Sequence, residues 1–358
     1  MQHLPSCVVA AITALLLLVN VSQASEEAIV RSKSPVVKAV NKTKNSIVTV
    51  RVPRPNGAKD MIGTGVIFDE RGFIITNRHV VGTSAQVKIH LADKTELDGE
   101  VLLADPHFDL AVVRIRAGKK LPVLPFGPVD DLMVGESVIA IGHPYGYSYT
   151  VSTGIISALG REITMPTGDV LSGLIQTNAS INPGNSGGPL LNINGEFIGV
   201  NVALREGAQN IAFAINVGTV KSFLSQNFNA VHVSGIQHGL KCSEKTLAET
   251  GDRQRVVVAG FQGDGKDVLC QGDEIMKVGA CQIANSFDVE RAFWGRKAGD
   301  KVQMKIVRQG QEMNVTLTVA ASDGAGQVTA QLPQAAISQP SGGAASVTTA
   351  SGPAINHR

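Results

Sequence analysis

The sequence has no marked excess of charge of either sign. Its 32 Lys and Arg residues nearly balance 30 Asp and Glu residues, and charged residues make up only 17% of the chain. Proteins that bind nucleic acid need clustered Lys and Arg for the phosphate backbone, and no long basic run is present. We therefore expect no nucleic acid partner. With 43% hydrophobic residues among 358, the chain has material for two hydrophobic cores.

The sequence also offers little for a membrane-spanning helix, which needs about 20 apolar residues. The apolar run from Cys7 to Val19 is shorter, and small residues ending in Ala24 follow it. This pattern predicts a secretory signal peptide at residues 1–24 and an exported protein, periplasmic or secreted. Because Met1-Gln2-His3 has no Lys or Arg, an uncleaved leader that anchors the chain in a membrane is the second hypothesis.

Cysteine is scarce as well, with four residues in all, and removal of the leader takes Cys7 with it. The remaining Cys242, Cys270 and Cys281 allow one disulfide at most. Cys270 and Cys281 flank a predicted strand, Glu274 to Val278, so at about 3.3 Å per strand residue they lie beyond the roughly 7 Å limit for a bridge. The alternatives are a bond that includes Cys242 and three buried free thiols.

Short strands dominate residues 41–228, which we predict to form one domain after a lead-in at residues 25–40. Each candidate strand is rich in Val and Ile and ends at Gly, Pro, Asp or Asn, which is typical of an all-β barrel or sandwich. The strands fall into two sets of similar size and predict a mainly β fold with two barrels. A helix from Val217 to Phe228 closes the region.

A smaller domain of mixed α/β character is predicted at residues 236–320, after a linker at residues 229–235. It has four candidate strands and one candidate helix, Ser286 to Gly295. Residues 321–358 are mostly Ala, Ser, Gly, Gln, Thr and Pro, with too few large apolar groups to offset the entropy of ordering. We predict a disordered tail there.

Ser186 lies in the most informative stretch, Asn182 to Leu190, where glycines enclose it between two predicted strands. A nucleophilic hydroxyl must project from a tight turn, and residues without Cβ tolerate the positive φ angles of such a turn. The N–H groups of Gly184 and Ser186 would then form an oxyanion hole for the charge that develops in acyl transfer. The alternative is a glycine-rich hairpin in which Ser186 has no chemical role.

A serine hydroxyl needs a base, and His79 is the candidate among eight histidines. It follows a predicted strand in a compact turn of the first barrel, where it can face Ser186 across a cleft between the barrels. Asp109 begins a strand of the same barrel and is expected to orient the imidazole. Asp105 competes for this role, but it precedes Pro106 in a dipeptide typical of turns. The order His, Asp, Ser is that of chymotrypsin, not of subtilisin or the α/β-hydrolases.

A different class of site, a metal bound by His79, His107 and His143, is the weaker alternative. These histidines lack the close spacing that metal ligands usually have along a chain. We expect no metal and no cofactor.

Three segments carry a family resemblance: TNRHVV at 76–81, DPHFDLAVV at 105–113 and QTNASINPGNSGGPLLNINGEFIGVN at 176–201. Over residues 40–320 the chain resembles the HtrA (Deg) family of serine proteases. The resemblance implies a chymotrypsin-like double β-barrel protease domain followed by a small PDZ-like domain. It also implies endoproteolysis of unfolded or misfolded exported proteins without cofactor or metal, and a homotrimer or higher homo-oligomer.

Substrate preference is partly predicted by the residues before the nucleophile. The neutral Ser180 lies where trypsin-like enzymes place an acidic group, so a basic P1 side chain would find no counter-charge. By analogy with the family, Ile181 and part of the segment from Asn201 to Leu204, with Val202 in it, line the S1 pocket and favour small aliphatic P1 residues such as Val, Ile or Ala. The carboxylate-binding loop of the family has its nearest match at residues 239–242, Gly-Leu-Lys-Cys.

Two functions are compatible with these observations. The first is a serine endopeptidase that acts on unfolded polypeptides and peptides through His79, Asp109 and Ser186. The second is a non-proteolytic peptide-binding or chaperone protein whose protease site is closed, with switching in loops such as Arg205 to Gln209. Degradation of an unfolded protein distinguishes them.

Overall fold

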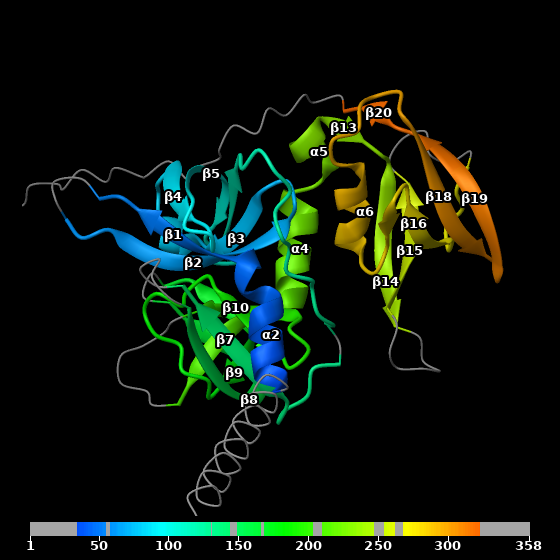
Figure 1. Ribbon diagram of the computed structural model, residues 1–358. Coiled ribbons are helices and arrows are strands. Elements are labelled where there is room, and N and C mark those ends of the chain that lie inside the picture. Colours follow the sequence, from blue (N-terminus) through cyan, green and yellow to red (C-terminus); the bar gives the residue numbers. More distant parts are fainter. Residues whose placement is uncertain are drawn as a thin grey trace, which may run out of the picture.

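The structure is a computed structural model that describes residues 34–54, 58–129, 131–143, 149–165, 168–202, 210–246, 254–261 and 268–322. The predicted signal peptide, most of the lead-in and nearly all of the predicted tail lie outside these ranges. Among the helices in them, none is long and apolar enough to cross a membrane. Figure 1 shows two barrels stacked on one another and a C-terminal domain beside them, with helices between.

Six antiparallel strands close the first barrel, in the order β1-β2-β3-β6-β5-β4. Their bounds are β1 Ile47–Val52, β2 Met61–Asp69, β3 Phe73–Asn77, β4 Gln86–His90, β5 Glu96–Asp105 and β6 Leu110–Ile115. Alternate Val and Ile side chains, such as Val50 and Ile74, fill the barrel core. A short helix, α3 (Arg78–Val81), follows β3 and carries His79.

Six further antiparallel strands close the second barrel, in the order β10-β11-β12-β9-β8-β7. Their bounds are β7 Ser137–Gly142, β8 Thr150–Thr164, β9 Val170–Thr177, β10 Pro189–Asn192, β11 Phe197–Val202 and β12 Ala212–Asn216. The Ser186 turn connects β9 to β10. Helix α2 (Pro35–Thr43) and a single 3₁₀ turn, η1 (Lys44–Ser46), precede β1. The mainly β, two-barrel fold predicted from the strand pattern is confirmed.

The C-terminal domain is a twisted antiparallel sheet with one helix against it. The sheet has the order β14-β15-β16-β18-β19, and β17 pairs with β16. The strands are β14 Leu240–Thr246, β15 Gln254–Phe261, β16 Glu274–Val278, β17 Cys281–Gln282, β18 Lys301–Arg308 and β19 Gln311–Thr318. Helix α6 (Ser286–Phe293) begins at Asn285, whose side chain accepts a hydrogen bond from the N–H of Asp288. Two short strands, β13 (Ile236–Gln237) and β20 (Ala320–Ala321), pair at the ends of the domain.

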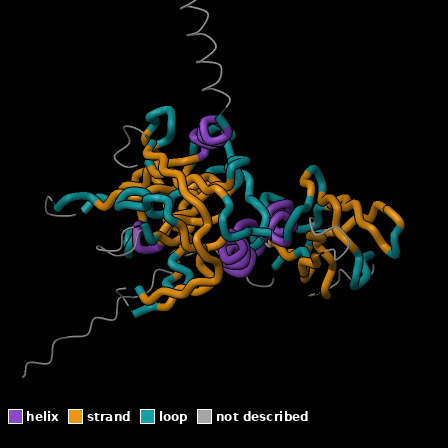
Figure 2. Tube along the Cα trace, turned by 90° about the horizontal axis from the view of Figure 1, so that it is seen from below, coloured by secondary structure: helices purple, strands orange, loops and turns teal. Residues whose placement is uncertain are grey.

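Two helices join the barrels to the C-terminal domain. Helix α4 (Val217–Asn227) was predicted, whereas α5 (Ala230–Ser234) falls within the segment expected to be a linker. Asn216 caps α4 and Asn229 caps α5, each through its side-chain oxygen, which explains why the chain turns helical at these points. Figure 2 shows helices between the barrels and the C-terminal sheet, whereas other helices lie at the outer edges of the barrels.

An aromatic cluster packs the first barrel against the C-terminal domain. Trp294 at the end of α6 contacts Phe73 and Phe228, with ring centroids 5.3 and 5.2 Å apart. Phe287 of α6 contacts Phe68 of β2 at 6.0 Å. Arg71 lies over the Trp294 ring at 4.8 Å and donates to the Trp294 carbonyl. Such pairs contribute beyond the apolar area that they bury, so the two parts form one packed unit.

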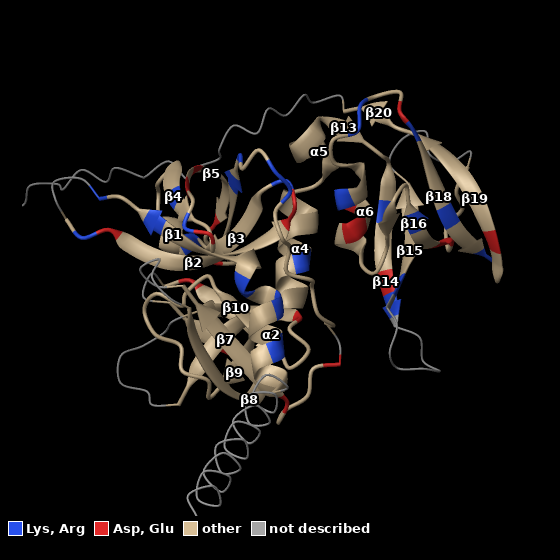
Figure 3. Ribbon diagram, viewed as in Figure 1, with Lys and Arg blue, Asp and Glu red and all other residues tan. Residues whose placement is uncertain are grey.

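Lys and Arg lie interspersed with Asp and Glu over the first barrel and the C-terminal domain, and few charged residues are visible on the strands of the second barrel (Figure 3). Cys242, Cys270 and Cys281 are free thiols, which answers the question of a disulfide among them. The alternative of three buried thiols is wrong, because Cys242 and Cys281 are half-buried and Cys270 is exposed in the turn before β16.

Candidate active site

His79 and Asp109 lie side by side in the first barrel and are joined twice. The Nδ1 atom of His79 lies 2.7 Å from Oδ2 of Asp109, and the backbone N–H of His79 donates to Oδ1 at 2.9 Å. Helix α3 begins directly after β3, so its first turn places the His79 ring over the start of β6. Both oxygens of one carboxylate therefore hold one histidine, which fixes the ring's orientation.

The backbone of Asp109 is held as firmly as its side chain. Its φ is +48°, an uncommon conformation for a residue with a side chain, and its carbonyl accepts from the N–H of Arg78 and Nδ2 of Asn77, both at 3.0 Å. The residue is only 3% exposed. A strained, buried carboxylate persists only where its surroundings determine it, and such residues gather at functional sites.

Asp105 has the turn-forming role predicted for it. Its Oδ1 accepts from the N–H groups of His107 and Phe108, at 2.8 and 3.2 Å, which closes the turn between β5 and β6. Its hydrogen bonds are thus local, and it helps to place Asp109 four residues later.

The Ser186 turn is packed against the first barrel. The N–H of Thr64 in β2 donates to the Ser186 carbonyl at 2.8 Å. Gly187 has a φ of +79°, and a Cβ there would come within 2.2 Å of the Thr64 carbonyl and of Thr76 Oγ1. Only glycine fits at this approach. Ser186 is 6% exposed and therefore lies in the junction of the two barrels.

The same contacts bring Ser186 to the side of the first barrel that carries His79. A Cβ on Gly63 would contact the Val80 side chain at 2.6 Å and the Ser186 carbonyl at 3.2 Å, so one glycine of β2 separates them. Val80 follows His79 in α3. The predicted base, carboxylate and nucleophile thus converge on one end of β2 and β3.

Several N–H groups around Ser186 already have carbonyl partners, in the turn or on β11. Asn185 donates to the Asn182 carbonyl at 2.9 Å, Gly188 donates to the Asn185 carbonyl at 2.9 Å, and Gly187 donates to the Asn201 carbonyl at 3.0 Å. None of these three can serve an oxyanion. Gly184, one of the two predicted donors, is buried and has a φ of +103°.

The predicted specificity residues lie on the second barrel. Ile181 is half-buried and packs against the barrel's apolar core, next to the exposed Ser180. Val202 is completely buried, so its side chain belongs to the core in this conformation. The rest of the predicted pocket segment, residues 203–204, and the loop 205–209 lie outside the described residues.

The histidines of the alternative metal site do not form a cluster. His107 is exposed in its turn, and His143 is buried and bound to Thr49 through Nδ1 at 2.9 Å. Within the ranges that the structure describes, no three His, Cys, Asp or Glu side chains come together as a metal site.

Thr64 is a residue of the site that sequence reasoning missed. Its side chain and backbone bind both ends of the Ser186 turn, through Gly184 and Ser186. The available signal was Gly63-Thr64-Gly65, because glycines within a strand mark a close approach of another segment.

Comparisons of the sequence with known proteins find serine proteases. The trypsin-like peptidase domain family matches residues 63–200. A probable periplasmic serine endoprotease, DegP-like, of Pseudomonas fluorescens is 37% identical over 76% of this chain and 59% of its own length. The putative serine protease HhoB of Synechocystis is 37% identical over 72% of this chain and 68% of its own.

A solved HtrA-type protease, AlgW with a tripeptide, aligns over 80% of this chain and 97% of its own, with 29% identity and a TM-score of 0.49. The chain spans about six-tenths of the length of the Pseudomonas relative.

Proposed function

The chain belongs to the DegP/HtrA family of serine proteases, and from this membership we propose that it is a serine endopeptidase. Its substrates would be unfolded or misfolded exported polypeptides. The observation that carries the proposal is the pair of hydrogen bonds between His79 and Asp109, beside the Ser186 turn.

In the proposed mechanism Ser186 Oγ attacks the scissile carbonyl carbon while His79 takes the hydroxyl proton. His79 then gives that proton to the leaving amine, which departs as the C–N bond breaks and leaves an acyl-enzyme. Water attacks the acyl carbon by the same steps and restores Ser186. Asp109 remains ionised throughout, holding the ring tautomer in which Nδ1 carries hydrogen and stabilising the imidazolium that forms.

The N–H groups of Gly184 and Ser186 are the proposed oxyanion hole. The developing charge sits on the former carbonyl oxygen, and donors aimed at it stabilise the transition state more than the bound substrate. Loss of one such donor typically costs about 10²- to 10³-fold in kcat.

We propose small aliphatic P1 residues as the preferred cleavage site. Ile181 offers apolar surface, and Ser180 beside it carries no charge to pair with Lys or Arg. Val202 would contribute to this pocket through its backbone, or through its side chain only after rearrangement, since it is buried.

The remaining assignments follow from the family. We propose that the C-terminal domain is a PDZ-like peptide-binding module, residues 236–320, behind a protease domain at residues 41–228. Export to the periplasm is proposed from the relative of that location and from the signal peptide pattern. A homotrimer or higher homo-oligomer is the proposed assembly.

Degradation of unfolded casein by the chain and by its Ser186→Ala variant tests this function. Fragments from the first and none from the second are expected, because the variant keeps every binding surface and lacks only the nucleophile. Casein that both proteins bind and neither cleaves would favour the non-proteolytic peptide-binding function instead.

A further inference from the structure

Thr64 lies on β2 at the junction of the two barrels, opposite Thr49 of β1, and is completely buried. Each of its polar groups has a partner. Its N–H donates to the Ser186 carbonyl at 2.8 Å, and its carbonyl accepts from Thr76 Oγ1 at 2.7 Å. The hydroxyl makes two more hydrogen bonds, both across the junction to the second barrel, one to His143 after β7 and one to Gly184 between β9 and β10.

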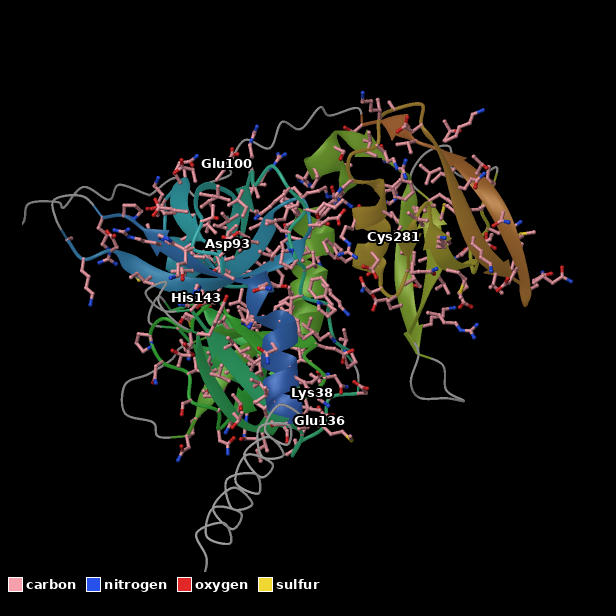
Figure 4. All side chains as sticks on the ribbon, in the orientation of Figure 1. Lys38, Asp93, Glu100, Glu136, His143 and Cys281 are labelled. Carbon is pink, nitrogen blue, oxygen red and sulfur yellow. The ribbon has the colours of Figure 1, made fainter. Side chains whose placement is uncertain are left out.

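The direction of the hydroxyl's hydrogen bonds is fixed by its partners. The backbone N–H of His143 can only donate, and it lies 2.9 Å from Thr64 Oγ1. The carbonyl of Gly184 can only accept, and it lies 2.6 Å away. The single hydroxyl proton must therefore point at Gly184, because a hydroxyl has one donor to give. Figure 4 shows His143 at the boundary between the barrels.

This hydrogen bond restrains one side of Gly184. The Gly184 carbonyl and the Asn185 N–H belong to one planar peptide group. Thr64 binds the oxygen of this group, and the Asn182 carbonyl binds its N–H at 2.9 Å, so the plane is held at both ends. The peptide on the other side of Gly184 carries the N–H that the proposed function assigns to the oxyanion hole.

Gly184 itself imposes little restraint. Its φ is +103°, and glycine adopts positive and negative φ values at similar energy. A rotation about the backbone bonds of Gly184 therefore costs little, and it would turn the N–H away from the site. A fixed plane on the Asn185 side limits that rotation. An oxyanion donor acts only when it is aimed in advance at the developing charge.

We propose that Thr64 is a positioning residue of the oxyanion hole, whose hydroxyl holds the Gly184 carbonyl and thereby keeps the Gly184 N–H aimed at the substrate. Thr64 binds the backbone of the Ser186 turn and acts through Gly184. The inference rests on the proposed function, since it assigns a role within the same site.

Thr49 provides a matched comparison. It is also a buried threonine, on the strand next to Thr64, and its hydroxyl also binds His143, through the carbonyl and Nδ1 of that residue. Its hydroxyl does not reach the Ser186 turn. Removing either hydroxyl thus takes a similar polar group from the junction, but only Thr64 holds Gly184.

Steady-state kinetics on a peptide nitroanilide ending in valine, with Thr64→Val, Thr64→Ser and Thr49→Val, tests the proposal. For Thr64→Val, which keeps the shape and loses the hydroxyl, we expect kcat to fall about 10- to 100-fold with KM within about two-fold of wild type. Thr64→Ser should recover most of kcat, and Thr49→Val should stay near wild type.

A peptide boronate supplies a readout that a structural role would not move. It bonds to the serine and presents an oxyanion, so Thr64→Val should weaken boronate affinity in proportion to kcat while affinity for the cleaved product peptide is unchanged. If Thr64→Val does not fold, Thr64→Cys against Thr64→Ser repeats the comparison with side chains of similar size.

The outcomes separate the two proposals. If the wild type is active and Thr64→Val has the same kcat as the wild type, the role of Thr64 is overturned and the protease function stays intact. Where Thr64→Val does not fold, equal kcat values for Thr64→Cys and Thr64→Ser lead to the same conclusion. An equal loss in Thr49→Val would reduce Thr64 to a packing residue. A wild type that cleaves no peptide and binds no boronate contradicts the proposed function, and the role of Thr64 with it.

Discussion

Asp109 receives two hydrogen bonds from His79, one from the ring and one from the backbone, and each goes to a different carboxylate oxygen. The two bonds differ in what they do. The backbone bond fixes the start of α3 relative to β6, and the ring bond fixes the tautomer. One buried side chain therefore sets both the position and the proton-accepting face of the proposed base.

Asp109→Asn should lower kcat by about 10⁴-fold with little change in stability, because an amide can present N–H to Nδ1 and favour the wrong tautomer. Asn also tolerates the positive φ of this position. Asp105→Asn is the control, since Asp105 binds only its own turn. The kcat of each variant is measured on a peptide substrate. A larger loss of kcat in Asp105→Asn than in Asp109→Asn would reverse the assignment of the two carboxylates.

Cleavage should occur after Val, Ile or Ala and seldom after Lys or Arg. The neighbourhood of Ile181 is apolar, and Ser180 provides no counter-charge for a basic side chain. Mass spectrometry of the fragments from unfolded casein identifies the P1 residues directly. Faster cleavage after Lys or Arg than after Val would contradict the proposed preference.

Trp294 is the only tryptophan of the chain, so its fluorescence reports the contact between the first barrel and the C-terminal domain. Phe73→Ala removes a ring 5.3 Å from it and should shift the emission to longer wavelength and increase acrylamide quenching. The lost packing should cost about 3–5 kcal/mol of unfolding free energy.

Phe223→Ala is the control for this shift. Phe223 is equally buried, but its ring partner is Phe108, within the protease part. It should lower stability while the native emission of Trp294 stays where it is. Identical emission in all three proteins would show that the aromatic cluster is not formed in solution.

The cysteines should differ in reactivity at pH 8. Burial, with nearby Glu290 and Glu244, raises the pKa of Cys242 to about 12, so this thiol stays protonated and unreactive. Cys270 is exposed and should be alkylated first by iodoacetamide. Peptide mapping of the chain without residues 1–24 measures both, and Cys270→Ser should remove the fast phase. Rapid alkylation of Cys242 in the folded protein would contradict the raised pKa of this half-buried thiol.

The strands and the proposed triad could be predicted because their signals are local. Alternating Val and Ile between turn residues indicates strands, and the glycines around Ser186 indicate a tight turn in any context. Pro106, which follows Asp105, distinguished Asp105 as a turn residue from Asp109 as the candidate carboxylate. These inferences needed no knowledge of which strands pair.

Thr64, the aromatic cluster and helix α5 depend on tertiary structure. Thr64 gains its role only when β2 pairs with β1 and the barrels meet, and the partners of its hydroxyl are 79 and 120 residues away. The aromatic cluster joins Phe73, Phe228 and Trp294 from distant segments. Helix α5 is only five residues long, which is too short for a periodic hydrophobic pattern. Asn229 can be recognised as its N-cap only from the hydrogen bonds that its side chain accepts in the structure.

The most direct measurement is the mass-spectrometric location of the adduct that a fluorophosphonate forms with the folded protein. The account predicts one adduct, on Ser186, absent from Ser186→Ala and formed far more slowly in His79→Ala. Loss of such a nucleophile typically removes about 10⁶-fold in kcat, so residual turnover should be undetectable in the same sample. An adduct on another serine, or casein cleavage that survives Ser186→Ala, would contradict the assignment of His79, Asp109 and Ser186 as the catalytic residues.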